Sequence, residues 1–123
     1  MYTDKVMENF RNPQNVGVVE NANAKYTVGS PECGDIMEMS MRIEEDVIVD
    51  IKFRTFGCAA AIASSSMATQ MLKGKTVDEA VKLKNTEVID ALGGLPPQKI
   101  HCSVLAEEAI RGAIEYYKNG RQE

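Results

Sequence analysis

The stretch Ile36-Met37-Glu38-Met39-Ser40-Met41-Arg42-Ile43 decides the fold of this chain. From Met37 onward, apolar side chains stand at every second position and polar side chains fill the positions between them. This period of two is typical of a β-strand that buries one face and exposes the other. The stretch therefore predicts a strand over residues 36–43. Its inward positions are Met37, Met39, Met41 and Ile43.

Two further strands are predicted beside this one. Residues 24–28 favour a strand, residues 29–35 a loop and residues 44–46 a polar turn. Residues 47–55 then alternate again. Because short connections join the three segments, they predict an antiparallel meander. The inward positions expected in the third strand are Val47, Val49, Ile51 and Phe53.

Helices are predicted before and after the three strands along the chain. Residues 2–9 favour a short helix with Val6 and Phe10 on one side. From Ala59 the apolar and small residues recur with the helical period, until Lys73-Gly74 supply a basic last turn and a glycine stop. The face expected to be buried consists of Ala59, Ile62, Ala63, Ser66, Met67, Gln70 and Met71.

Two short helices are expected next. Thr76-Val77-Asp78-Glu79 matches a capping box and predicts a helix to about Leu83. Asn85 or Thr86 is expected to cap the following helix, which Gly93-Gly94 ends.

A final helix is expected from His101 or Cys102 to about Lys118, with Gly112 as a weak point that costs about 1 kcal/mol against Ala. Strands come first and most helices later, so the pattern predicts an α+β fold. We expect a three-stranded antiparallel sheet packed against several helices, in one domain spanning residues 1–123. Residues 1–23 are expected to be a partly mobile N-terminal segment and residues 119–123 a frayed tail.

The charge and composition of the chain disfavour several classes of partner and location. The net charge is -4 and the pI about 5.1, which argues against nucleic acid or an anionic membrane as the main partner. No apolar segment approaches the ~20 residues that span a bilayer, and no signal peptide is visible. Three Cys cannot all pair internally. Reduced thiols in the cytoplasm are therefore expected.

The three cysteines are widely spaced. Between Cys33 and Cys58 lie 24 residues, and between Cys58 and Cys102 lie 43. This spacing excludes a local zinc knuckle, whose ligand pairs are held by tight turns. Each Cys falls at the end of a predicted element, so the fold could bring the three together with Asp35 and His101. Soft thiolates suit zinc and iron–sulfur chemistry.

Plainer interpretations exist for each of these residues. A thiol at a helix N-terminus favours the thiolate form, but Cys102 could equally be a small buried hydrophobe beside a surface His101. On spacing alone, Asp35 is more simply a loop residue that bonds its own backbone. The residues by themselves leave these alternatives open.

Three motifs together resemble a known family. They are Pro31-Glu32-Cys33-Gly34-Asp35, the run from Phe56-Gly57-Cys58-Ala59 to Ser66, and the run from Leu95-Pro96-Pro97-Gln98-Lys99 through Ile100-His101-Cys102 to Ala106. The chain resembles the IscU scaffold proteins of iron–sulfur cluster assembly and the similar N-terminal module of NifU, from Tyr2 to about Lys118. The resemblance implies a compact α+β fold in which iron and sulfide are combined into a labile [2Fe-2S] cluster.

The resemblance also implies roles for single residues. Cys33, Cys58 and Cys102 would be cluster ligands, and Asp35 would ligate iron and make the cluster labile. The resemblance implies roles for two more residues. His101 would be an alternate ligand, and Lys99 would be a basic residue beside the site. Cys102 is also the best candidate for receiving persulfide sulfur, because a helix N-terminus and nearby cations favour its thiolate.

Partners follow from the same resemblance. A cysteine desulfurase of the IscS/NifS type would supply sulfur as a persulfide, and acceptor apoproteins such as ferredoxin would take the finished cluster. A frataxin-like protein is a further candidate partner. Hsp70/J-type chaperones read the Leu95–Lys99 segment in many relatives, but Gln98 here replaces the usual Val.

Other classes of protein remain to be weighed against an assembly scaffold. One is a zinc-dependent sulfurtransferase resembling SufU, but that type usually carries an insertion before the third Cys and lacks the preceding His, whereas this chain has His101. A Cys–His nucleophilic enzyme is disfavoured, since adjacent residues on a helix point about 100° apart. A structural zinc protein is the last alternative, and zinc could occupy the cluster-free form in every case.

Overall fold

The computed structural model describes residues 2–30, 35–56 and 59–120, and at Ser30, Asp35 and His101 it describes the backbone only. The elements in chain order are α1 (Asp4–Arg11), β1 (Ala24–Ser30), β2 (Asp35–Glu44), β3 (Val47–Phe56), α2 (Ala59–Leu72), α3 (Val77–Val81), α4 (Asn85–Ala91), the 3-10 turn η1 (Pro97–Lys99) and α5 (Ile100–Gly120). The loop expected at residues 29–35 is shorter, because β1 runs to Ser30 and β2 begins at Asp35, and the tail expected at 119–123 is still helical to Gly120. The rest of both segments, residues 31–34 and 121–123, lies outside the described residues.

The three strands form one antiparallel sheet in the order β1-β2-β3, which confirms the predicted meander and α+β class. The alternation in β2 is also confirmed, because Met37, Met39 and Met41 are fully buried. Burial of one such side chain contributes about 1.5–3 kcal/mol relative to exposure. The methionines of β2 therefore form the centre of the core.

The expected inward face of β3 is wrong at one end. The register shifts between Arg42 and Ile43, so that Ile43 pairs with Ile48 and the extra residue Val49 bulges out. Ile48 is fully buried, whereas Val49 is 44% exposed. Beyond a bulge, each residue of the strand faces the side of the sheet opposite to the one that strict alternation assigns to it. The alternation pattern alone therefore cannot predict which residues are buried there.

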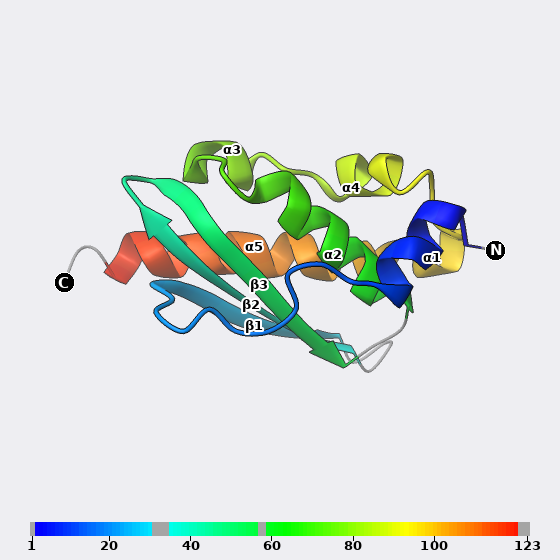
Figure 1. The fold of residues 1–123 in the computed structure, drawn as a ribbon, viewed down its shortest axis with the longest axis horizontal. Coiled ribbons are helices and arrows are strands. Elements are labelled where there is room, and N and C mark those ends of the chain that lie inside the picture. The colour runs from blue at the N-terminus through cyan, green and yellow to red at the C-terminus, as the bar shows by residue number, and fades with distance from the viewer. Residues whose placement is uncertain (1, 31–34, 57–58, 121–123) are drawn as a thin grey trace.

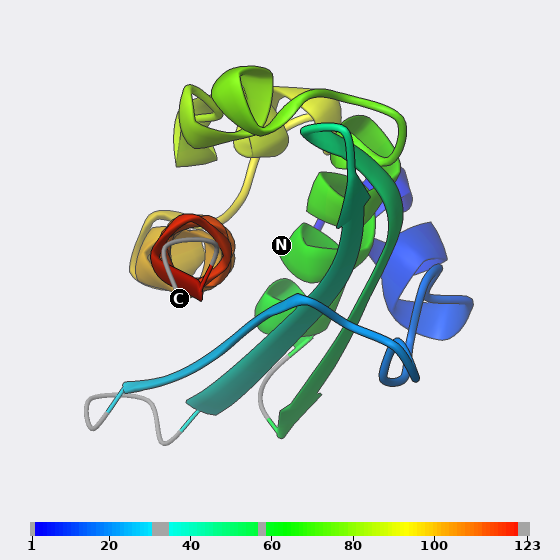
Figure 2. The same ribbon diagram turned by 90° about the vertical axis from the view of Figure 1, so that its left-hand side faces the viewer.

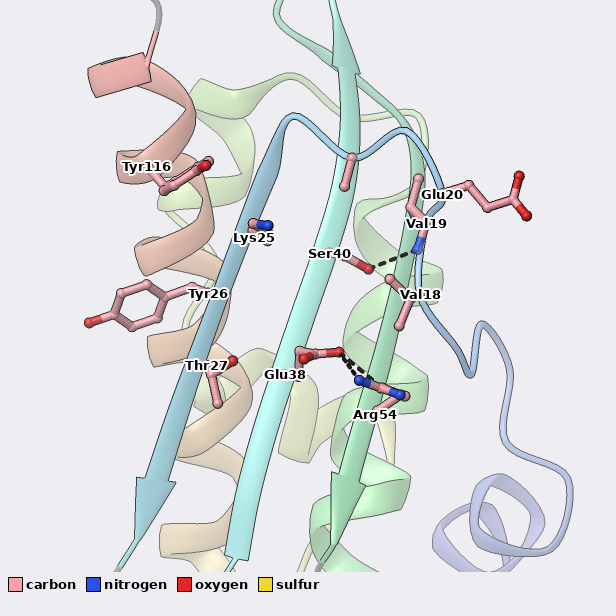
Figure 3. Close-up of a pocket in the computed structure, with 11 residues that line it drawn as sticks. Val18, Val19, Glu20, Lys25, Tyr26, Thr27, Glu38, Ser40, Arg54 and Tyr116 are labelled. Carbon is pink, nitrogen blue, oxygen red and sulfur yellow. Dashed lines mark hydrogen bonds and ion pairs between the residues drawn. The ribbon is translucent and has the colours of Figure 1, made fainter.

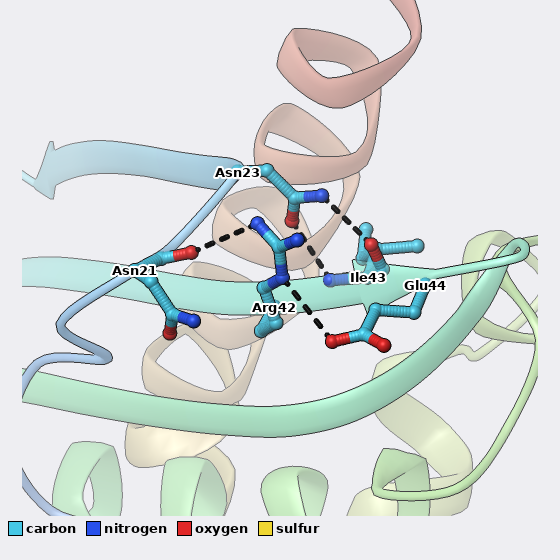
Figure 4. Close-up of polar contacts among 5 residues, drawn as sticks. All are labelled: Asn21, Asn23, Arg42, Ile43 and Glu44. Atoms are coloured by element: carbon cyan, nitrogen blue, oxygen red, sulfur yellow. Dashed lines mark hydrogen bonds and ion pairs between the residues drawn. The ribbon is translucent and has the colours of Figure 1, made fainter.

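The amide side chain of Asn23 completes the sheet beside this bulge. Its Nδ2 donates to the carbonyl of Ile43 over 2.7 Å, and its Oδ1 accepts from the N–H of Ile43 over 2.7 Å. Arg42 donates to the carbonyl of Asn21 and pairs with Glu44 (Figure 4). These contacts hold the chain that enters β1 against the end of β2.

Two helices cover one face of the sheet. α5 packs on β1 and β2, α2 packs on β3, and the two helices also touch each other. Figures 1 and 2 show α2 and α5 on the same side of the sheet, with α3 and α4 beyond them. We call the covered side the inner face and the opposite side the outer face.

Helix α2 is buried nearly all round, so the expectation of one buried face is wrong for it. Ser65 donates to the sulfur of Met37 on the sheet, and Ser66 donates to Asn9 on α1. Gln70 and Met71, which were expected on the buried face, are exposed and half-buried. α1, β3 and α5 surround α2, and its Ala and Ser residues let these neighbours approach closely.

The N-terminal segment is held by both apolar and polar contacts. On α1, Val6 is fully buried, and its neighbour on the buried face is Asn9 instead of the expected Phe10, which is 38% exposed. Gln14 donates from its backbone to Ser66, and the Asn15 side chain donates to Thr69. These contacts dock the segment on α2, and partial mobility of residues 1–23 stays a prediction.

Residues 15–22, which we call the strap, run beside and across the sheet. Gly17 donates to the carbonyl of Phe53, and Phe53 donates to that of Asn15, so the strap pairs with the edge of β3. It then crosses the outer face, where Val19 donates to Ser40 over 3.0 Å (Figure 3). The strap therefore covers an edge that would otherwise expose unpaired backbone groups.

The helix ends agree with the predicted stops. Gly74, Gly93 and Gly94 all have positive φ, the backbone conformation that ends helices and suits glycine. Thr76 and Glu79 form the predicted capping box. The cap expected at Asn85 or Thr86 is wrong, because α4 already begins at Asn85 and Lys84 precedes it without a side-chain cap.

Candidate iron–sulfur assembly site

The register of the sheet brings together the chain segments that lead to two predicted ligands. Ser30 at the end of β1 pairs with Asp35, and Ile36 pairs with Phe56 at the end of β3. Paired strands lie about 4.8 Å apart. The segments 31–34 and 57–58 therefore leave the sheet from neighbouring positions at one end. Cys33 and Cys58 themselves lie outside the described residues.

The described elements that flank these segments point to the same end of the molecule. Figure 1 shows the end of β1, the start of β2 and the end of β3 on the side of the chain's N-terminus, where α2 and α5 also begin. Asp35 is the first residue of β2. The segments that carry Cys33 and Cys58 thus both connect to this end of the sheet. We call it the site end.

Cys102 lies in the first turn of α5, as the sequence predicts, but its side chain is fully buried. It belongs to the core cluster that includes Leu105, Ala106 and Ala109. Burial agrees with the plainer of the two interpretations left open for Cys102, that of a small buried residue. The reason is that α5 begins at Ile100 and turns its third residue toward the sheet and α2, and not toward solvent.

The residues around Cys102 fix the start of α5. Ser103 is fully buried, donates to the carbonyl of Ile100 over 2.7 Å and accepts from Asn85 over 3.3 Å. Glu107 accepts from the backbone N–H of Asn85 over 2.9 Å and pairs with Arg111. The start of α4 is thereby bonded to the first two turns of α5, beside the predicted ligand.

Lys99 ends the turn η1 and is half-buried, and His101 is the second residue of α5. His101 directly precedes Cys102 along the chain, and Lys99 lies three residues before it. Pro97 and Gln98 are exposed at the same place, so the Leu95–Lys99 segment presents part of its length to solvent.

On the outer face, two pairs of side chains follow one another at the site end. Ile36 stands opposite Phe56, and one step further along the strands Glu38 stands opposite Arg54. Ile36 is 47% exposed and Phe56 is 79% exposed. Glu38 and Arg54 form an ion pair of 2.9 Å. Sequence reasoning missed this apolar pair, although both residues are apolar at outward positions directly beside Asp35 and Gly57.

A hollow of about 500 Å³ lies on the outer face between the strap and the strands, and the pair Glu38–Arg54 forms part of its lining (Figure 3). Its polar lining is of mixed charge and includes Glu20, Lys25, Glu38 and Arg54. Among the residues that the structure describes, its lining contains no Cys or His. Within the described ranges 2–30, 35–56 and 59–120, no group of three or more His, Cys, Asp or Glu could hold a metal ion.

The domain thus combines three antiparallel strands, with α2 and α5 on one face, and the segments that carry Cys33 and Cys58 connect to one end of this sheet. The family model described as "NifU-like N terminal domain" matches residues 1–123, and the chain belongs to this family.

Relatives agree with this assignment. The chain is 57% identical over 123 residues to iron–sulfur cluster assembly scaffold protein IscU 1 of Archaeoglobus fulgidus, which covers 98% of this chain and 80% of that protein. It is 49% identical to the scaffold protein IscU of Aquifex aeolicus, with 99% of this chain and 80% of that protein covered.

Among solved structures, the SUF-system scaffold protein SufU of Fervidobacterium islandicum matches with a TM-score of 0.75 at 23% identity, over 92% of this chain and 96% of that one. This likeness shows a shared fold and does not extend to function. In the part of the chain that the structure describes, no helix is long and apolar enough to cross a membrane.

Proposed function

We propose that this chain is a scaffold on which iron and sulfur are combined into a labile [2Fe-2S] cluster that is then passed to acceptor apoproteins. The observation that carries the proposal is the register at the site end. Asp35 and Phe56 flank the segments that hold Cys33 and Cys58, and they belong to one paired end of the sheet. Thiolate ligands suit such a cluster.

The roles that we propose for single residues follow from ligand chemistry. Cys33, Cys58 and Cys102 hold the irons through thiolates, which bind them firmly. The carboxylate of Asp35 is a hard and therefore weaker ligand at the fourth position, and His101 is the alternate ligand there. The cluster is the cargo of the protein, and the protein itself is not a turnover enzyme.

The proposed sulfur donor is a cysteine desulfurase that delivers a persulfide to Cys102, with Lys99 attracting the charged sulfur. Because the side chain of Cys102 is buried in this structure, this delivery requires the first turn of α5 to rearrange. Acceptors of the ferredoxin type take the cluster, in a cytoplasmic setting. A frataxin-like protein and Hsp70/J-type chaperones complete the proposed partners, the chaperones with less support because Gln98 departs from the usual segment.

Anaerobic reconstitution tests the proposal. The chain is incubated with ferrous iron, cysteine, a desulfurase and a thiol reductant, which supplies the remaining electrons that reduce persulfide sulfur to sulfide, and visible absorption is recorded. A [2Fe-2S] spectrum with two irons and two sulfides per cluster is the expected product. A chain that binds zinc tightly, accepts persulfide and never develops the spectrum would instead be a sulfurtransferase of the SufU type. Zinc in a purified sample does not decide between the two, since zinc suits the same thiolates.

A further inference from the structure

One hydroxyl joins the N-terminal segment to the chain that leads into α5. The side chain of Thr3 accepts from the backbone N–H of Val6 over 3.1 Å and thereby caps α1. The same hydroxyl donates to the carbonyl of Leu92 over 2.5 Å, although 89 positions separate the two residues. Leu92 is fully buried and is the C-cap residue of α4. A single group therefore completes the start of one helix and the end of another.

The residues around this bond are packed on both sides of it. Tyr2 and Leu95 are half-buried, and both pack against the core. Gly93 lies so near that a Cβ added to it would be 3.5 Å from the methyl carbon of Thr3. Figure 1 shows α1, the end of α4 and the start of α5 at the same end of the molecule. We call the contact of Thr3 with Leu92 and Gly93 the latch.

Helix α4 depends on its neighbours at both of its ends. It has seven residues and no side-chain cap of its own, and a helix of this length is not stable by itself in water. The N–H of its first residue, Asn85, donates to Glu107 on α5, and the carbonyl of its C-cap residue accepts from Thr3. Loss of the latch therefore removes a hydrogen bond from a buried helix end.

The end of α4 also controls where α5 begins. Cys102 lies ten positions after Leu92, and the chain between them passes through η1 directly into α5. The side chain of Cys102 is fully buried in the first turn of that helix. A reagent or a sulfur donor thus reaches the thiol only when this connection moves. The latch fixes one end of the segment that has to move.

We propose that the latch is a conformational device that keeps the first turn of α5 closed over Cys102, and that its release opens the thiol to the sulfur donor. The second part rests on the proposed function, in which a persulfide is delivered to Cys102. In that exchange the Cys102 thiolate attacks the outer sulfur of the donor's persulfide, and the donor's thiolate leaves. No oxidant or reductant is consumed.

Substitutions of Thr3 separate the latch from the cap of α1. Thr3→Asp keeps an acceptor for the N–H of Val6, but its carboxylate has no hydrogen to donate to Leu92. Thr3→Ser keeps both hydrogen bonds. Thr76→Val is the matched control, because Thr76 also caps a helix through its hydroxyl and pairs with Val47 at the opposite end of the sheet from the site end.

The measurements use the full chain without metal. Modification of Cys102 by iodoacetamide is timed by mass spectrometry of its peptide, under native conditions and in guanidinium chloride. Hydrogen exchange reports the opening of α4, of residues 100–104 and of β2, and urea unfolding gives the free energy of global unfolding. Sulfur transfer from a desulfurase to Cys102 is timed in a separate assay.

We expect Thr3→Asp to raise the native modification rate of Cys102 about two- to tenfold, the shift that loss of one hydrogen bond produces. Exchange in α4 and at residues 100–104 should rise by a similar factor while exchange in β2 stays at the parent rate. Thr3→Ser should match the parent. Thr76→Val should lower the free energy of global unfolding and leave the native Cys102 rate unchanged. In guanidinium chloride all four proteins should react equally, because only access to the thiol differs.

Two results would overturn the proposal. One is a parent rate at Cys102 in Thr3→Asp. The other is an equal rise in Thr3→Asp and Thr76→Val, because the thiol would then be reached by unfolding of the whole chain.

The two assays at Cys102 separate the latch from the proposed function. If iodoacetamide reacts faster in Thr3→Asp but no sulfur reaches Cys102 in any of the proteins, the latch is confirmed and the proposed delivery to Cys102 is rejected. If sulfur reaches Cys102 at the same rate in all four proteins, delivery stands and the gating of the donor by the latch is rejected.

Discussion

The ring of Tyr26 on β1 lies directly against Gly112 of α5, so close that a Cβ on residue 112 would overlap the ring. The sequence marked Gly112 only as a weak point in a helix. The structure gives the reason for it, because glycine is the residue that lets the ring of an adjacent strand lie on the helix backbone. Together with the core below, this contact sets how closely α5 approaches the sheet.

Gly112→Ala is therefore expected to lower the free energy of unfolding by roughly 1–3 kcal/mol, because the new methyl group overpacks the ring. In a Tyr26→Ala background the same change should instead raise stability by about 1 kcal/mol, since Ala is the better helix former. Urea unfolding of the four proteins of this cycle measures both values. A gain in both backgrounds would mean that the half-exposed ring simply turns away.

Burial of Cys102 predicts slow chemistry at its thiol. In the native, metal-free chain, iodoacetamide should modify Cys102 at least about 100-fold more slowly than in guanidinium chloride, because the reagent reaches it only when the start of α5 opens. Mass spectrometry of the peptide that contains Cys102 gives the two rates. Similar rates would show that the first turn of α5 is open most of the time.

Asp35→Ala should still acquire a cluster but hold it longer, and should donate it more slowly to an apo-ferredoxin. Three thiolates remain, and the weak carboxylate that favours release is gone. If Asp35 only shapes its loop, the substitution should shorten the lifetime of the cluster. The rate of cluster loss to a chelator distinguishes the two, because the expected changes have opposite signs.

The capping box at α3 makes stability depend on pH. Hydrogen bonds from the backbone N–H and the hydroxyl of Thr76 hold the pKa of Glu79 below its ordinary value of 4.5. A carboxylate with a lowered pKa stabilises the fold above that ordinary value, and the contribution is lost as the pH falls through the folded-state pKa. The stability difference between the parent and Glu79→Ala should thus shrink from pH 7 to pH 3 in urea unfolding. Glu79→Gln, which keeps an acceptor at this position, is the matched control, and an equal loss at both pH values would contradict the assignment.

Local patterns in the sequence determined the class of fold and the places where elements stop. The alternation through Met37, Met39 and Met41 predicted the central strand because a strand turns successive side chains to opposite faces. Gly74 and the pair Gly93-Gly94 ended helices, and the capping box at Thr76 began one, for reasons that lie within a few residues of the chain. The motifs around the three cysteines indicated the family without any coordinates.

The tertiary structure decided everything that depends on partners far away in the chain. Val49 faces outward because a bulge forms against Ile43, and Cys102 is buried because α5 packs on β1, β2 and α2. Ile36 and Phe56 become a pair only through the register of β2 with β3. Register and burial are properties of contacting elements, and no spacing within a single segment contains them.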